Sequence, residues 1–224
     1  VLTYDDALEI LQEESTEDIE KLSGIGGEQS EVSYLNTSVV QHFRRRVTWL
    51  VGLAFVSLLS GYVMFRFNSV LDHVRLLTLF LPMVVAAGGN SGGQAATMVI
   101  RAMALGEIST GNAVRIAWKE TRTGLMLGLS LGIVMALFIS FVLPYLKRDG
   151  TGADFDFFHL AFAVSAALMV QVLSATILGA LLPICARTIK LDPAVVSAPS
   201  LASTVDISGM MIYFITVGTI LGIR

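Results

Sequence analysis

The chain has 224 residues, of which 54% are hydrophobic and 15% are charged, and its mean hydropathy is +0.72. A water-soluble domain of this length rarely reaches these values, so composition alone favours a membrane protein. The single cysteine, Cys185, excludes an intrachain disulfide framework and leaves no second thiol for a zinc site. The net charge of −3 is unevenly distributed, because ten of the 18 acidic residues fall within the first 31 positions.

The acidic N-terminal region is predicted to form a helix and a linker. Residues 3–23 read as a helix that begins at Thr3 and stops at Gly24, and residues 24–40 are rich in Gly, Ser and Glu. We therefore divide the chain into an acidic cytosolic helix with its linker (1–40) and a membrane domain (41–224). The first residue is Val, so an upstream part is expected to be missing.

Five apolar runs follow the linker, and each is long enough to cross a bilayer as a helix, for which ~20 residues suffice. They cover residues 47–65, 76–100, 123–146, 158–186 and 194–223. The polar stretch from Arg101 to Arg122 is predicted to form a short interfacial helix. The expected fold is an all-α polytopic membrane protein with five transmembrane helices per chain.

The distribution of Lys and Arg predicts the orientation of these spans. With the N-terminus in the cytosol, nine Lys and Arg residues near the span ends lie inside and five lie outside. Because cytoplasmic loops carry the excess of positive charge, the acidic helix is placed in the cytosol and the C-terminus outside. The predicted location is the cell (inner) membrane, with the lipid bilayer as the surroundings and no nucleic-acid partner.

Small residues are concentrated in the second span, over residues 86–97. Gly88 and Gly92 are four residues apart, as are Gly89 and Gly93, which gives two overlapping GxxxG patterns. Such patterns allow helix backbones to approach closely, or allow a helix to expose carbonyl groups to a cavity.

Asp206 is the one carboxylate inside an apolar run, near the middle of the fifth span. A charged side chain there costs at least ~2.5 kcal/mol on insertion scales, so it should face the bundle interior or a wet pathway. Three interpretations follow: a cation pathway, a protonated or hydrogen-bonded Asp206 that links helices through Asn90 or Gln94, and a proton relay. The cation pathway is preferred, because no Lys or Arg lies within any span.

Magnesium suits a site with few carboxylates. Mg²⁺ is usually held by one or two carboxylates and keeps several of its waters. A two-fold dimer would supply two Asp206 side chains, which match the charge of one divalent cation. Further acidic candidates are Asp192, before the fifth span, and Glu107, after the second. In the N-terminal helix, Glu14 and Asp18 form one of two like-charged i,i+4 pairs, which a cation could bridge; the alternative is a solvated acidic face.

Several segments resemble the MgtE family of magnesium channels. The segments at 88–94 (GGNSGGQ) and 101–108 (RAMALGEI) are similar to the family patterns GGNAGTQ and RGLALGEI. The fifth span, with 192–194 (DPA) and Asp206 followed by Gly209 and 213–214 (YF), resembles the last helix of that family, and 14–19 (ESTEDI) resembles the start of its cytosolic plug helix. Residues 1–12 resemble only the tail of a regulatory CBS domain.

The resemblance implies a homodimer whose central pore lies at the dimer interface and is lined by the second and fifth spans. It implies a pore magnesium site at Asp206, with the backbone carbonyl of Ala202 one turn away. The implied regulatory magnesium sites involve Glu14, Glu17, Asp18, Asp192 and Glu107, and the implied pore-lining residues are Gly89, Asn90, Gly93, Ser203 and Gly209. Cytosolic Mg²⁺ would then close the pore through the acidic plug helix.

Other functions remain as alternatives. One alternative is a transporter of broader specificity, which passes Co²⁺ or Mn²⁺ as well as Mg²⁺ into the cytosol. An intramembrane serine hydrolase would use Ser91 in a GxSG arrangement, but His159, the one histidine near a span, falls at the outer edge. A passive scaffold would have no use for Asp206. No GxxxxGK[ST] loop is present, so coupling to nucleotide hydrolysis by this chain is not expected, and the chain is not predicted to be an enzyme.

Overall fold

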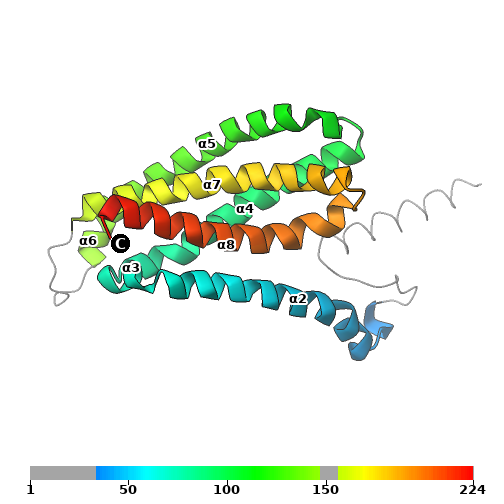
Figure 1. The fold of residues 1–224 in the computed structure, drawn as a ribbon, viewed down its shortest axis with the longest axis horizontal. Helices are drawn as coiled ribbons and strands as arrows, with labels where there is room; N and C mark the ends of the chain where they lie inside the picture. Colours follow the sequence, from blue (N-terminus) through cyan, green and yellow to red (C-terminus); the bar gives the residue numbers. More distant parts are fainter. Residues whose placement is uncertain (1–33, 147–155, 224) are drawn as a thin grey trace, which may run out of the picture.

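The structure, a computed structural model, describes residues 34–146 and 156–223. Five long helices run lengthwise through the described part of the chain and form a bundle (Figure 1). They are α2 (Val39–Arg66), α4 (Leu77–Ala104), α5 (Ala113–Leu137), α7 (Phe157–Thr188) and α8 (Pro193–Leu221). Within the two described ranges there is no strand, which agrees with the predicted all-α class.

Short elements precede, connect or extend the long helices. Two are single 3₁₀ turns and one is a π-helical turn, and two are helices of six and four residues. In chain order they are η1 (Tyr34–Asn36), α3 (Asn68–His73), η2 (Thr110–Asn112), η3 (Phe138–Val142) and α6 (Leu143–Leu146).

Four of the five predicted spans are confirmed as helices long and apolar enough to cross a membrane. They lie at Val39–Arg66, Thr110–Tyr145, Phe157–Thr188 and Ser200–Leu221. The remaining prediction corresponds to α4, which has 28 residues and is therefore as long as α2. Its middle is rich in Gly, Asn and Gln, which lowers its hydropathy below that of the other four.

The predicted interfacial helix between Arg101 and Arg122 is wrong as a separate element. Helix α4 continues to Ala104 and ends in a Schellman motif, in which Gly106 has a φ of +70° and the N–H of Glu107 donates to the Ala102 carbonyl. Helix α5 then begins at Ala113. No Gly or Pro occurs between residues 113 and 123, so nothing in the sequence ends α5 before the apolar run begins.

Helix α7 occupies the centre of the bundle. It packs against α5, α4 and α8, and α4 also packs against α8, whereas α2 contacts the bundle along α8 (Figure 1). Small residues make these contacts close. On α5, β-carbons placed on Gly124, Gly128 and Gly132 would lie 2.8–3.3 Å from atoms of α7. Glycines spaced by four residues therefore form the α5 side of the contact.

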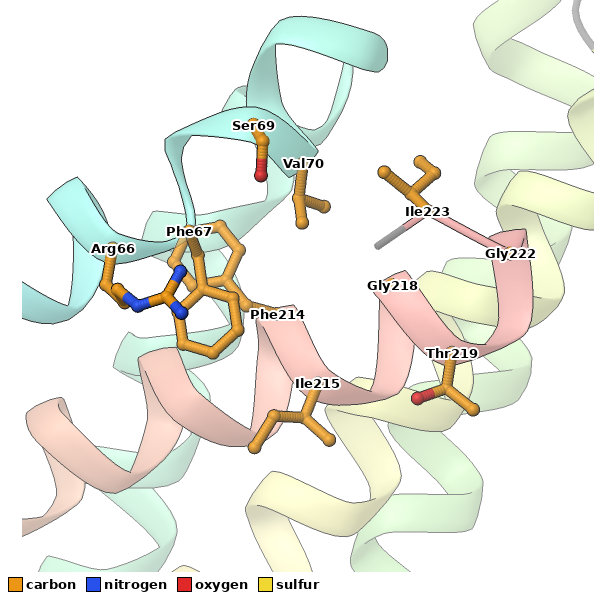
Figure 2. A pocket seen from close by; sticks show the side chains of 10 residues that line it. All are labelled: Arg66, Phe67, Ser69, Val70, Phe214, Ile215, Gly218, Thr219, Gly222 and Ile223. Atoms are coloured by element: carbon orange, nitrogen blue, oxygen red, sulfur yellow. The ribbon is translucent and has the colours of Figure 1, made fainter.

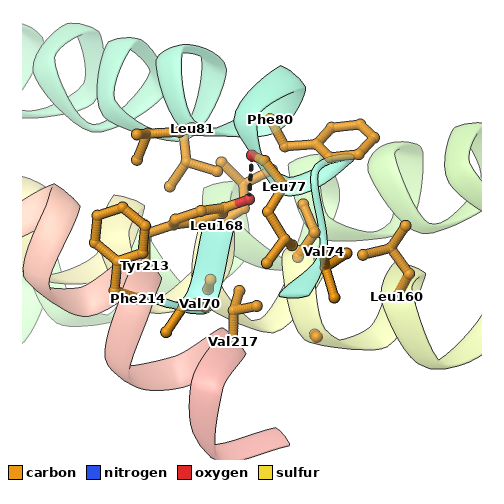
Figure 3. Close-up of a cluster of buried hydrophobic side chains, with 14 of the residues drawn as sticks. Val70, Val74, Leu77, Phe80, Leu81, Leu160, Leu168, Tyr213, Phe214 and Val217 are labelled. Atoms are coloured by element: carbon orange, nitrogen blue, oxygen red, sulfur yellow. Dashed lines mark hydrogen bonds between the residues drawn. The ribbon is translucent and has the colours of Figure 1, made fainter. Parts of the chain in front are cut away.

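The largest hydrophobic cluster lies near the end of the bundle where α2 ends and α4 begins. Tyr213 of α8 is fully buried in it, and its hydroxyl group donates a hydrogen bond of 2.7 Å to the carbonyl of Leu77 at the start of α4 (Figure 3). A buried tyrosine needs such a partner for its polar end. This bond fixes α8 against α4 two turns beyond Asp206.

Candidate functional site

Asp206 lies on α8 with its side chain half-buried. Within the described ranges its carboxylate has no hydrogen-bond or ion-pair partner, and Asn90 and Gln94 of α4 are exposed. The interpretation of Asp206 as a hydrogen-bonded link to Asn90 or Gln94 therefore receives no support from the geometry. An unpartnered carboxylate within a membrane helix is costly and is typical of an ion pathway.

The backbone beside Asp206 is held in place by α7. Gln171 of α7 is fully buried, and its side-chain Nε2 donates a hydrogen bond of 3.1 Å to the carbonyl of Val205. The same amide group fills the space left by two glycines, Gly88 of α4 and Gly209 of α8. One side chain thus joins three helices next to the candidate site. Sequence reasoning missed Gln171, although a lone Gln within an apolar run is itself a signal of a buried polar contact.

The two GxxxG patterns of α4 face in different directions. Gly88 and Gly92 are buried, and a β-carbon on Gly92 would lie 2.8 Å from the carbonyl oxygen of Ala175 on α7. A β-carbon on Gly89 or Gly93 would meet no atom within 4 Å. The first pattern therefore packs the helix within the chain, and the second opens away from the rest of the chain.

The open side of α4 is polar. Asn90, Gln94 and Thr97 are exposed beside Gly89 and Gly93. Exposed amide groups on a membrane-length helix are expensive in contact with lipid. This face therefore requires water, an ion pathway or a second protein surface next to it.

The predicted residues of α8 divide between open and buried positions. Ala202 is exposed and Ser203 is partly exposed, one turn before Asp206. Gly209, by contrast, is buried, and a β-carbon there would lie 2.6 Å from Nε2 of Gln171. The structure thus places Gly209 in a contact within the chain.

The acidic residues predicted at the cytosolic mouth lie in two loops at one end of the bundle (Figure 1). Glu107 is exposed in the loop after α4, and Asp192 is exposed directly before α8. The remaining predicted ligands, Glu14, Glu17 and Asp18, lie outside the described residues. Over residues 34–146 and 156–223, no three His, Cys, Asp or Glu side chains gather in a metal-binding arrangement.

The geometry does not support a serine nucleophile. Ser91 is buried, and its hydroxyl group shares a hydrogen bond of 2.6 Å with the hydroxyl group of Thr176 on α7. His159 instead bonds through Nε2 to the carbonyl of Ile220, near the end of α8. Ser91 therefore lacks the adjacent base that nucleophilic catalysis needs, and it serves as an interhelical contact.

The chain is similar in sequence to known divalent cation transporters. A family model described as MgtE, divalent cation transporter, matches residues 81–216, the region from α4 to α8. The chain is 33% identical over 213 residues to the "Magnesium transporter MgtE" of Thermus thermophilus, and 29% identical over 214 residues to the protein of the same name from Bacillus subtilis. These matches cover 95% and 96% of the chain but 44% of each relative, so the chain spans less than half the length of the curated relatives. The chain belongs to the MgtE family of divalent cation transporters.

Proposed function

We propose that the chain carries Mg²⁺ into the cytosol down its electrochemical gradient, along a pathway bordered by the open face of α4 and by Asp206 of α8. The observation that carries this proposal is the half-buried Asp206 carboxylate, which has no protein partner in the described ranges. Its charge would be compensated by the passing cation. The names of the relatives, which are magnesium transporters, support the choice of ion.

The membrane potential is a sufficient driving force. Moving one charge through 100 mV is worth about 2.3 kcal/mol, so a divalent cation gains about 4.6 kcal/mol. The proposed transport therefore needs no nucleotide. A cation that keeps part of its hydration shell suits one carboxylate and the adjacent backbone carbonyl of Ala202 better than a full protein cage would.

The complete pathway requires two copies of the chain. One chain supplies a single carboxylate in the middle of an apolar run, Asp206, whereas a two-fold dimer supplies two. The open polar face of α4, with Gly89, Asn90 and Gly93, would then face the pore together with Ser203, and α4 would be the fifth span. We place the N-terminus in the cytosol and the C-terminus outside, in accord with the excess of Lys and Arg at the cytosolic ends.

Regulation by cytosolic Mg²⁺ is part of the proposal. Glu14, Glu17 and Asp18 would bind the ion together with Asp192 and Glu107 at the mouth of the pore. Bound Mg²⁺ would hold the acidic helix against the membrane domain and close the pathway. When the ion is lost, repulsion between the carboxylates would release the helix.

Replacement of Asp206 by Asn tests the transport proposal. The variant keeps the size and shape of the side chain but loses its charge, so Mg²⁺ flux into dye-loaded proteoliposomes should fall to background. Asp72→Asn is the matched control, because Asp72 is an exposed carboxylate of α3 that bonds to Asn68. Wild-type flux through a folded Asp206→Asn protein would refute the proposal. The same assay with Co²⁺ and Mn²⁺ measures how broadly the pathway selects divalent cations.

A further inference from the structure

A groove lies between α2 and α8, at the end of the bundle opposite to Arg44, Arg45 and Arg46. Its volume is about 610 Å³, within the range of ligand-binding pockets. Figure 2 shows that the α2–α3 connection forms one wall and the last turns of α8 form the other. Within the described residues α2 contacts the bundle mainly along α8, and the groove lies beside this contact.

Apolar side chains form most of the groove. The rings of Phe67 and Phe214 stack at a centroid distance of 5.4 Å, and Ile215 and Val70 extend the same surface. Gly218 also lines the groove and adds no side chain to fill it. The groove is therefore a slot bounded by aromatic and aliphatic groups, which matches a hydrocarbon chain.

Arg66 supplies the one cationic group in the lining. Arg66 lines the groove together with Phe67 and Phe214, and Ser69 lies on the adjacent α3 (Figure 2). Arg66 is exposed, and within residues 34–146 and 156–223 it has no carboxylate partner. An anion is thus the complementary ligand for this end of the groove.

The position of Arg66 along α2 places it at the depth of lipid headgroups. Between Arg46 and Arg66 lie 19 residues without a charge, and 20 helical steps of 1.5 Å span about 30 Å, the thickness of the hydrocarbon layer. Tyr62, one turn earlier, is exposed, as expected for an aromatic residue near an interface. Arg66 therefore lies at the height of the phosphate layer, with the apolar part of the groove beside the acyl region.

From these observations we propose that the groove binds an anionic phospholipid, with the phosphate group on Arg66 and an acyl chain along Phe67, Phe214 and Ile215. The guanidinium group of Arg66 can donate two hydrogen bonds to phosphate oxygens, and Ser69 lines the same groove. This site goes beyond cation transport and is separate from Asp206. The proposed ligand is a lipid and not a soluble phosphate, because most of the groove lining is apolar.

Native mass spectrometry of the delipidated full chain in detergent tests the proposal. Dioleoyl-phosphatidylglycerol and dioleoyl-phosphatidylcholine are offered in equal amounts, and phosphatidylglycerol should bind preferentially. Arg66→Gln should lower its binding about fivefold, the effect expected for one basic residue near a membrane surface. Arg75→Gln is the control, because Arg75 is also exposed near this end of the bundle but does not line the groove.

Two further measurements test the apolar part. Thr219→Phe should fill the groove and reduce lipid binding, whereas Met211→Phe, at an exposed position of α8 outside the lining, should not. Three results would overturn the site: equal binding by the wild type and Arg66→Gln, equal losses in Arg66→Gln and Arg75→Gln, or binding of glycerol 3-phosphate as strong as that of the lipid. Disulfide-linked dimers of a Thr219→Cys protein, in a Cys185→Ala background, would show instead that a second copy covers the groove.

Discussion

Gly92 of α4 and Gly179 of α7 lie so close together that a β-carbon on Gly179 would overlap the carbonyl oxygen of Gly92. The contact joins backbone to backbone, so neither partner can rotate away as a side chain would. It connects the inner GxxxG pattern of α4 to the central helix and fixes how closely the two approach. The open pattern, at Gly89 and Gly93, is consequently turned to the other side of α4.

The first prediction concerns this contact. Gly179→Ala should lower the free energy of unfolding by about 1–3 kcal/mol, because the added methyl group forces two backbones apart. Unfolding of the purified protein in detergent measures the change. Gly93→Ala is the matched control, since its β-carbon would meet no atom within 4 Å. Equal stabilities for the two variants would contradict the close approach of α4 and α7.

A second prediction concerns Gln171 and Gly209. Gly209→Ala alone should destabilise the protein, because the new β-carbon would lie 2.6 Å from Nε2 of Gln171. Gln171→Ala removes that obstacle as well as the hydrogen bond to Val205. The double variant should therefore be more stable than the sum of the two single losses predicts, by about 0.5–3 kcal/mol. Pairing Gly209→Ala with Ser57→Ala, at an exposed position of α2, should give simple additivity.

The third prediction separates structure from catalysis at Ser91. Ser91→Ala removes the hydrogen bond to Thr176, which should cost about 0.6 kcal/mol, the average for such bonds between membrane helices. Mg²⁺ flux in proteoliposomes should persist, because Ser91 is buried against α7 and does not face the open side of α4. Complete loss of flux in a folded Ser91→Ala protein would show that Ser91 has a direct role in transport.

The sequence predicted the helical fold well because the relevant signals are local. Apolar runs bounded by charged residues located all the long helices, with the largest error at α5, which begins at Ala113 and not at residue 123. It was harder to predict which glycines of the second span face the rest of the chain. The pattern shows two interleaved pairs of glycines, and only the packing against Gln171, Ala175 and Gly179 decides that the pair Gly88 and Gly92 faces inward.

The burial of Gly209 could not be predicted from sequence for the same reason. Gly209 follows Asp206 by three residues, so the helical repeat predicts that both lie on the same side of α8. In the structure, however, Gly209 faces α7, where Gln171 occupies the space. Which of two adjacent faces is buried depends on a residue 38 positions away in the sequence. Asp206 could be chosen as a candidate from sequence alone, because one carboxylate in an apolar run is unusual in any packing arrangement.

The fourth prediction tests the direction of the open face. In a Cys185→Ala background, single cysteines at Asn90, Gly93 and Gln94 should react with a charged methanethiosulfonate reagent in the assembled protein, since these positions would border the aqueous pathway. Cysteines at Ser91 and Gly92 should be protected, because these residues are buried. Mg²⁺ at millimolar concentration should slow the reaction at the open positions. Uniform reactivity along α4 would contradict a pathway on one face.

The last prediction concerns the acidic helix. The i,i+4 spacing of Glu14 and Asp18 brings like charges together, and this repulsion weakens a helix by a few tenths of a kcal/mol unless a cation bridges the pair. Millimolar Mg²⁺ should therefore protect residues 24–40 from protease in the wild type, and the triple change Glu14→Gln, Glu17→Gln and Asp18→Asn should weaken that protection. Neutralising Glu28 and Glu31, which lie in the linker itself, is the matched control and should leave the protection in place. If Mg²⁺ protects the triple variant as well as it protects the wild type, the acidic helix does not bind the regulatory ion, and the gate must depend on Asp192 and Glu107 instead.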